Sequence, residues 1–222
     1  MNHESTRPYL DQVRTWPKEG RHILAHYDEE HIVVYQAYRP AIGRYAAEHQ
    51  RFGGEFSFSR MSWIKPNFLW MMYRSGWGTK EGQEITLAVT IPRVLFDEIL
   101  ASAVPSTFDA TRFETHDAWK QALATSDVRL QWDPDHGPDG AAQARRAIQL
   151  GLRGSMLRRY AADEVVKIED ISSFVAEQRR HVTASFEKLI TPIESVYWPG
   201  HEDAANATNL DLAPTLPLIS HE

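Results

Sequence analysis

Residues 84–91, EITLAVTI, place apolar side chains at alternate positions. Such alternation over eight residues is typical of a β-strand that turns one face to a core. Residues 31–38, HIVVYQAY, are rich in β-branched and aromatic side chains and predict a second strand. Arg39-Pro40 ends that strand, because proline lacks the N–H donor that a β-ladder needs. We expect these two strands in the centre of a sheet.

Further helices and strands are predicted on either side of these two strands. Helices are predicted at 41–50, 66–73, 92–100, 141–152 and 170–190, with further strands at 128–132 and 164–168. The run DPDHGPDG at 133–140 predicts a turn. Because strands and helices do not alternate regularly, the expected fold is a single α+β domain with a split mixed β-sheet flanked by helices. The expected organisation is an extended arm over 1–20, the domain over 21–198, and a poorly ordered tail over 199–222.

The composition excludes several classes of function. The 222 residues are 42% hydrophobic, contain no cysteine, and carry a net charge of -6 from 24 basic and 30 acidic side chains. Disulfides, cysteine zinc sites and thiol nucleophiles are therefore excluded, and the chain as a whole has no attraction for polyanions. No apolar run approaches the roughly 18 residues of a membrane span. A cytoplasmic location without a membrane partner is expected.

Three segments combine arginine with aromatic side chains in an unusual density. They are YQAYRPAIGRY at 35–45, SRMSWIKPNFLWMMYRSGW at 59–77, and RRAIQLGLRG at 145–154. Guanidinium groups bind phosphates bidentately and indole rings stack on planar rings, so this pattern indicates a planar anionic ligand. The alternative is that the aromatic rings fill the core and the arginine stems cover them.

Other chemical motifs are not completed in this sequence. His22, His26 and His31 lie near Asp28, but no ligand triad is formed, and no metal site is expected. Ser75 has no nucleophile elbow around it, and no glycine-rich phosphate loop of the Rossmann or Walker type is present.

The phrases VVYQAYRPAIGRYA, SWIKPNFLWMMYRSGW and RAIQLGLRG resemble the signature blocks of the domain of unknown function 4291 family, over roughly residues 20 to 195. A weaker resemblance links the order of segments to ADP-ribosyltransferases of the DarT kind, which modify DNA. That resemblance implies an ADP-ribosyltransferase-like fold, NAD as a substrate, and a nucleic-acid base or nucleotide as acceptor.

The resemblance also assigns roles to residues. Gln36 falls where those enzymes have a first-strand histidine, and Gln149 falls near their catalytic glutamate. These two are the expected catalytic residues, and Arg39 or Arg44 is expected at the phosphates. The expected NAD-binding residues are Tyr38, Arg39, Arg44, Arg60, Trp63, Lys65 and Arg74.

Gln36 and Gln149 differ from the histidine and the glutamate of the DarT-like enzymes, and this difference affects the chemistry. A carboxylate stabilises the oxocarbenium-like state of ADP-ribosyl transfer, whereas an amide supplies no charge, and one such contact is worth about 10²–10³ in rate. Gln149 therefore predicts a slow enzyme, another acid such as Glu164 or Glu55, or a non-catalytic module that binds a nucleotide or RNA in the same cleft. A scaffold whose tryptophans all lie in the core is the third alternative.

Overall fold

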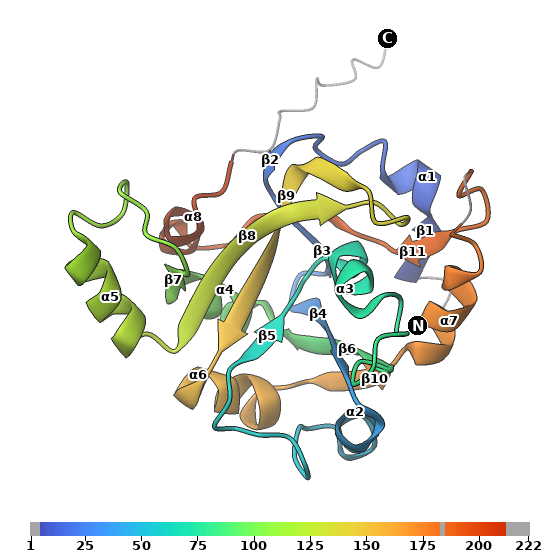
Figure 1. Ribbon diagram of the computed structural model, residues 1–222, viewed down its shortest axis with the longest axis horizontal. Coiled ribbons are helices and arrows are strands. Elements are labelled where there is room, and N and C mark those ends of the chain that lie inside the picture. Colours follow the sequence, from blue (N-terminus) through green and yellow to red (C-terminus); the bar gives the residue numbers. More distant parts are fainter. Residues whose placement is uncertain (1–4, 183–184, 212–222) are drawn as a thin grey trace.

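Two β-sheets meet where the backbones of Tyr35 and Lys65 form an antiparallel bridge, with the N–H of each donating to the carbonyl of the other at 2.7 and 3.2 Å. The computed structural model describes residues 5–182 and 185–211. Helices pack around the two sheets, so the chain is α+β as the sequence predicts (Figure 1).

The first sheet is antiparallel, with the strand order β10-β6-β4-β3-β12. Its centre is β4 (His31–Tyr38) against β6 (Ile85–Pro92), and both strands lie within one residue of their predicted ranges. Val34 and Val89 pair and pack into one hydrophobic cluster, while their neighbours Tyr35 and Ala88 pack into another on the opposite face. The other strands are β10 (Lys167–Asp170), β3 (Ile23–Tyr27) and β12 (Ser195–Tyr197).

The second sheet is mixed. β9 (Ala142–Leu152) is antiparallel to β8 (Val128–His136) along one edge, and its other edge pairs with β2 (Gly20–Arg21) and β5 (Ser62–Ile64). β7 (Ala103–Pro105) runs parallel to the start of β8. The mixed pairing that the sequence predicts is therefore found in this sheet, whereas the two predicted central strands belong to the antiparallel one.

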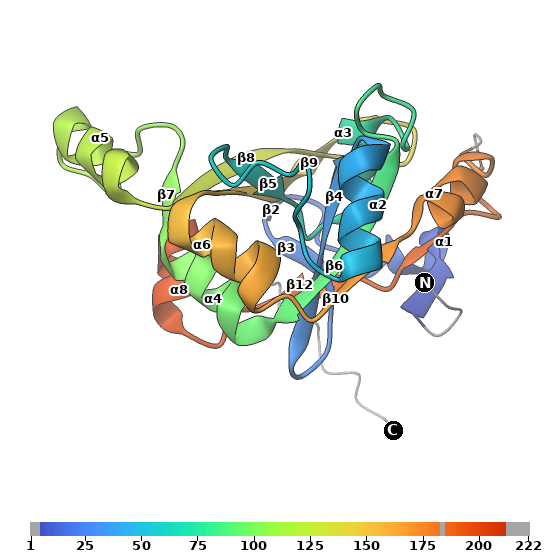
Figure 2. The same cartoon turned by 90° about the horizontal axis from the view of Figure 1, so that it is seen from below.

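Helices cover the sheets from several sides. α3 (Phe68–Ser75) contacts β4 and β8, and α2 (Pro40–His49) packs on β6. Figure 2 shows α5 (His116–Thr125) at one end of the molecule and α7 (Ser172–Arg179) toward the other. Three further helices are α4 (Arg93–Ala101), α6 (Gly154–Arg158) with a π-helical turn at Arg159–Asp163, and α8 (Glu202–Thr208). No helix of the described residues is long and apolar enough to cross a bilayer.

The prediction of a helix over 141–152 is wrong, because this segment is the strand β9. Alanine, arginine, glutamine and leucine favour helices, but here the segment gains ladder hydrogen bonds on both edges and buries Ile148 and Leu150. The predicted turn at 133–140 is also too long. β8 continues to His136 through a bulge near Pro134, and only residues 137–140 turn the chain.

Two further predictions need correction on the C-terminal side. The helix expected over 170–190 is confined to α7, since Gln178 is buried and its side-chain oxygen accepts a hydrogen bond from Ile190 N at 3.0 Å as the chain folds back. The strand expected at 164–168 begins later, at Lys167, because Glu164 still follows the π-helical turn.

The segments expected to be an arm and a tail are partly ordered against the body. Residues 5–20 contain β1 (Thr6–Pro8), which pairs with β11 (Ile190–Pro192), and the short helix α1 (Tyr9–Gln12). Trp16 is 3% exposed and donates its indole N–H to Glu194 O at 2.8 Å. In the expected tail, α8 buries Ala204 and Thr208, and residues 212–222 lie outside the described residues.

Candidate functional site

Two adjoining cavities of about 380 Å³ each open beside the junction of the two sheets. They share Trp63, Lys65 and Arg74, and we refer to them together as the cleft. One cavity reaches β8 and β9, and the other reaches the end of β4. Besides the shared residues, the cleft is lined by Gln36, Ala37, Tyr38, Arg60, Met61, Ser62, Trp70, Met71, Gln83, Gln131, Asp133 and Gln149.

The structure thus brings seven of the nine predicted site residues to the cleft. These are Gln36, Tyr38, Arg60, Trp63, Lys65, Arg74 and Gln149. Arg39 lies in a neighbouring cavity of about 440 Å³ and forms an ion pair with Glu55 at 2.6 Å. Arg44 is exposed on α2 and lines neither the cleft nor that neighbouring cavity. The phosphate role predicted for Arg44 therefore has no geometric support, whereas the cavity of Arg39 adjoins the cleft and shares Tyr38, Arg60, Met61 and Ser62 with it.

Lys65 is held rigidly at the floor of the cleft. Its backbone forms the bridge to Tyr35, and Pro66 after it favours an extended conformation. The side chain is only 6% exposed, and no carboxylate of the described residues lies within 4 Å of its ammonium group. Burial and the nearby Arg74 lower the pKa of Lys65 to about 8, against the opposing attraction of Asp133.

Asp133 supplies the carboxylate of the cleft. Gln131 donates to its Oδ1 at 2.8 Å, and Gln149 donates to its Oδ2 at 2.7 Å. Gln131 and Gln149 are paired opposite each other on β8 and β9, so the sheet register brings both amides to one carboxylate. Asp133 falls within the turn predicted at 133–140 but lies in the strand β8. The alternation of Gln131 with Asp133 across the apolar Trp132 is the signal that could have placed it in a strand.

Gln36 has protein partners on both atoms of its amide. Its oxygen accepts from Tyr160 at 2.7 Å, and its nitrogen lies 2.9 Å from Tyr38 OH, 2.8 Å from Ser62 Oγ and 3.2 Å from Trp63 O. Gln36 is 2% exposed, so this network ties β4 to β5 beneath the cleft. Burial raises the pKa of the Tyr38 hydroxyl to about 12, although its bonds to Ser62 and Gln36 oppose the rise.

The two indole rings of the cleft, those of Trp63 and Trp70, differ in how far a ligand can reach them. Trp63 is half-buried and faces Gly151 across the β5–β9 pair. Trp70 is 4% exposed and stacks with Tyr73 and His136, at centroid distances of 5.4 and 5.3 Å. The indole N–H of Trp70 is buried without an acceptor among the described residues. Trp63 is thus the ring whose face a ligand can reach, and Trp70 offers an unsatisfied donor.

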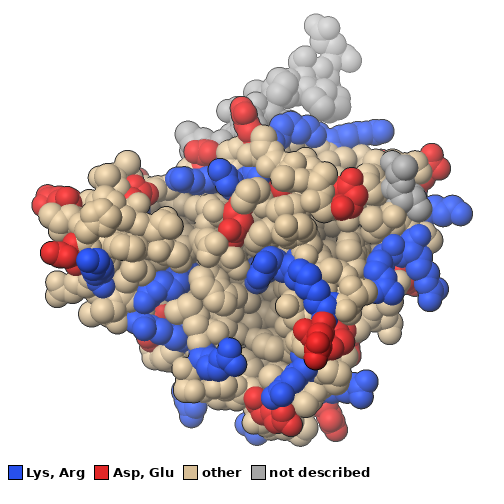
Figure 3. Space-filling model, viewed as in Figure 1, with Lys and Arg blue, Asp and Glu red and all other residues tan. Residues whose placement is uncertain are grey.

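The two other acids suggested by the sequence are not in the cleft. Glu164 forms an ion pair with Arg159, and Glu55 forms the pair with Arg39 described above. Neither lines the cleft. Around the cleft itself the balance is basic, because Arg60, Lys65 and Arg74 face a single carboxylate. Figure 3 shows several Lys and Arg side chains in the middle of this face, around the hollow between β8 and α3.

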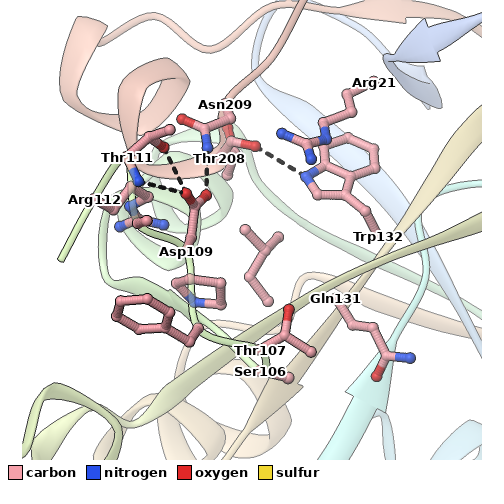
Figure 4. A pocket seen from close by; sticks show the side chains of 14 residues that line it. Arg21, Ser106, Thr107, Asp109, Thr111, Arg112, Gln131, Trp132, Thr208 and Asn209 are labelled. Atoms are coloured by element: carbon pink, nitrogen blue, oxygen red, sulfur yellow. Dashed lines mark hydrogen bonds between the residues drawn. The ribbon is translucent and has the colours of Figure 1, made fainter. Parts of the chain in front are cut away.

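A larger cavity, of about 690 Å³, lies on the other side of β8, and several of its polar groups are already paired with one another (Figure 4). The Asp109 carboxylate accepts from the backbone and hydroxyl of Thr111 at 2.9 and 2.6 Å and from Asn209 at 3.0 Å. Trp132 donates to Thr208 O at 2.9 Å, and Arg112 donates to backbone carbonyls. Because these groups hold the 106–112 loop and α8 together, the cavity is less suited to a polar ligand than the cleft.

Comparison with known proteins identifies the chain at the level of its family. No group of three His, Asp or Glu side chains among the described residues is placed to hold a metal ion. No curated protein matches the chain. The model of one family, the domain of unknown function DUF4291, matches residues 22–197, which include every residue that lines the cleft. Since this match spans most of the 222 residues, the chain belongs to the DUF4291 family.

Proposed function

We propose that the cleft binds NAD and that the chain transfers its ADP-ribose to a nucleic-acid base or nucleotide. The observation that carries this proposal is the Asp133 carboxylate, which is fixed by two glutamine amides and flanked by Trp63 and by cations that lack ion-pair partners among the described residues. A fixed carboxylate, a reachable indole and unpaired cations complement the ribose, the planar rings and the phosphates of a dinucleotide.

Asp133 carries the negative charge that Gln149 lacks, so Asp133 is suited to stabilise the positive charge that develops on the ribose. In ADP-ribosyl transfer the bond between the nicotinamide nitrogen and the ribose C1′ breaks, and its electron pair leaves with nicotinamide. The ribose then carries positive charge, which a carboxylate stabilises. A nucleophilic atom of the acceptor bonds to C1′ and loses its proton. Gln149 acts here as a positioning residue, because it holds Asp133 Oδ2 at 2.7 Å.

A non-catalytic module that binds a nucleotide or RNA is the second candidate. It is favoured by the chemistry of Gln36, whose amide is committed to Tyr160, Tyr38 and Ser62 in the interior. A side chain with this many internal partners is not free to bind a substrate. The cations and Trp63 are sufficient to bind a phosphate-bearing planar ligand without any reaction.

The two candidates are separated by incubating the protein with labelled NAD and a mixture of nucleotides and oligonucleotides. The transferase releases nicotinamide and labels an acceptor. Asp133→Asn keeps the shape and lowers the turnover about 10²–10³-fold while NAD still binds. Asp163→Asn, at an exposed carboxylate outside the cleft, is the matched control and leaves the turnover unchanged. Binding of ADP-ribose without nicotinamide release under any condition supports the module and refutes the transferase.

A further inference from the structure

Two positive side chains of the cleft lie together without neutralisation. Lys65 projects from the end of β5 and Arg74 from the last turn of α3, and both line the two cavities. Among the described residues, neither has a carboxylate within 4 Å of its nitrogen atoms. The nearest acid in the cavity, Asp133, already accepts from two amides. Two like charges near each other are unfavourable, and more so where water is scarce.

The burial of Lys65 beside Arg74 destabilises the folded protein unless a ligand neutralises the positive charge. Lysine is almost never buried unless it is paired, yet Lys65 is 6% exposed. The buried indole N–H of Trp70, which lines the same cavity, also lacks an acceptor. A buried donor without an acceptor destabilises the folded protein, because it has lost its hydrogen bonds to water. Two cations without a carboxylate within 4 Å among the described residues, beside a buried N–H that lacks an acceptor there, complement a ligand that brings several anionic oxygens.

We propose that Lys65 and Arg74 form a diphosphate site, with the Trp70 N–H as an additional donor. This inference rests on the proposed function for the identity of the ligand, since NAD carries a diphosphate between its two ribose groups. It places the phosphates at the junction of the sheets instead of at Arg39, which is paired with Glu55, or at Arg44, which lies outside the cleft. Two cations from different elements can each contact one phosphoryl group.

Proton linkage gives the site a recognisable signature. A bound diphosphate stabilises the ammonium form of Lys65, and so it raises a pKa that burial and Arg74 have lowered to about 8 in the free protein. Binding above pH 8 therefore takes up a proton at Lys65. Below pH 7 the lysine is already protonated, and this uptake disappears. A lysine that only packs in the core does not show this behaviour.

The test uses inorganic pyrophosphate as the probe and isothermal titration calorimetry on the full chain. Wild type binds pyrophosphate more tightly than inorganic phosphate. Lys65→Met and Arg74→Met each weaken pyrophosphate binding by about 10–100-fold, the usual worth of a charge-assisted hydrogen bond. Lys120→Met removes an exposed lysine of α5, outside the cleft, and leaves the affinity unchanged. Titrations at pH 8.5 in buffers of different ionisation enthalpy show proton uptake in wild type and none in Lys65→Met.

The outcomes separate this inference from the proposed function. Pyrophosphate binding that depends on Lys65, without any nicotinamide release from NAD, supports the diphosphate site and counts against the transferase. Nicotinamide release with unchanged pyrophosphate affinity in Lys65→Met supports the transferase and overturns the diphosphate site. Absence of pyrophosphate binding by wild type also overturns it. Arg74 is exposed, so Arg74→Met provides a variant whose folding does not depend on the substituted side chain.

Discussion

At the scale of single residues, Lys65 has the clearest conflict between stability and binding. A pKa of about 8 for a group whose ordinary pKa is 10.5 corresponds to a cost on the order of 3 kcal/mol for the charged form in the folded protein. Because Lys65 is nearly buried, hydration stabilises its ammonium group only a little. The fold tolerates this cost only because other contacts, such as the Tyr35 bridge, fix the backbone at this position.

We therefore predict that Lys65→Met, which has a similar volume, raises the thermal unfolding temperature at pH 7 by about 5–10 °C. Between pH 8 and 10.5 the folded protein binds fewer protons at Lys65 than the unfolded chain does, so wild-type stability rises with pH across this window. The variant lacks that rise, and the gap between the two proteins closes toward pH 10. Thermal scans at pH 7 and pH 10 check both points, and a less stable variant at pH 7 would contradict them.

At the scale of elements, the strand β9 determines how much of the site can be predicted from the sequence. The strand β6 could be predicted from its alternation and β4 from its β-branched and aromatic side chains, and the two strands pair with each other along their whole length. β9 could not be predicted, because its residues favour a helix and only its partners β8, β5 and β2 make it a strand. The sequence predicts Gln149 in the cleft but gives no sign of its partner Asp133, because their contact follows from the register of β8 on β9.

Gly151 of β9 shows how this register shapes the cleft. A Cβ at this position would lie 2.6 Å from Met61 Sδ and 3.0 Å from the ring of its paired residue Trp63. We predict that Gly151→Ala displaces Trp63, weakens ADP-ribose binding, and destabilises the fold by about 1–3 kcal/mol.

The fluorescence of a nucleotide titration and the midpoint of urea unfolding measure the two effects of Gly151→Ala. Gly200→Ala is the matched control, because the added Cβ meets nothing nearer than 3.3 Å and lies outside the cleft. Unchanged ADP-ribose affinity in Gly151→Ala, although the fluorescence shows Trp63 displaced, would show that the ring does not contact the ligand.

At the scale of the whole molecule, segments that are distant in the sequence pack against one another. Trp16 packs on the guanidinium of Arg145 at 5.4 Å, and Arg145 is bound to the buried Asp135 at 2.5 Å. The matched family region begins at residue 22, so Trp16 belongs to a segment that lies before that region yet is integrated with it. The sequence did not predict this, because its prolines and polar residues resemble a linker and the contacts are with residues more than 120 positions away.

Glu194 links the N-terminal segment to α3 through its backbone and its carboxyl group. Its Oε1 accepts from Phe68 N at the start of α3, its N–H donates to Gln12, and its carbonyl accepts from Trp16. Burial raises the pKa of Glu194 to about 8, since the hydrogen bond from Phe68 only partly compensates for lost hydration. The carboxyl is therefore mostly protonated at neutral pH in the folded protein.

The sign of the linkage follows from this raised pKa. Between the ordinary pKa of 4.5 and about 8, the folded protein keeps a proton that the unfolded chain releases, so stability falls as the pH rises, by up to about 1.4 kcal/mol per pH unit from this group. Glu194→Gln keeps the acceptor for Phe68 N and cannot ionise. We predict that its stability relative to wild type grows from pH 5 to pH 8, as measured by urea unfolding at three pH values. Glu187→Gln, the same change at an exposed site, follows the wild-type profile. Parallel profiles for Glu194→Gln and wild type would show that Glu194 is already ionised behind α3, and that α3 and the cleft are held by a buried charge instead of a neutral acid.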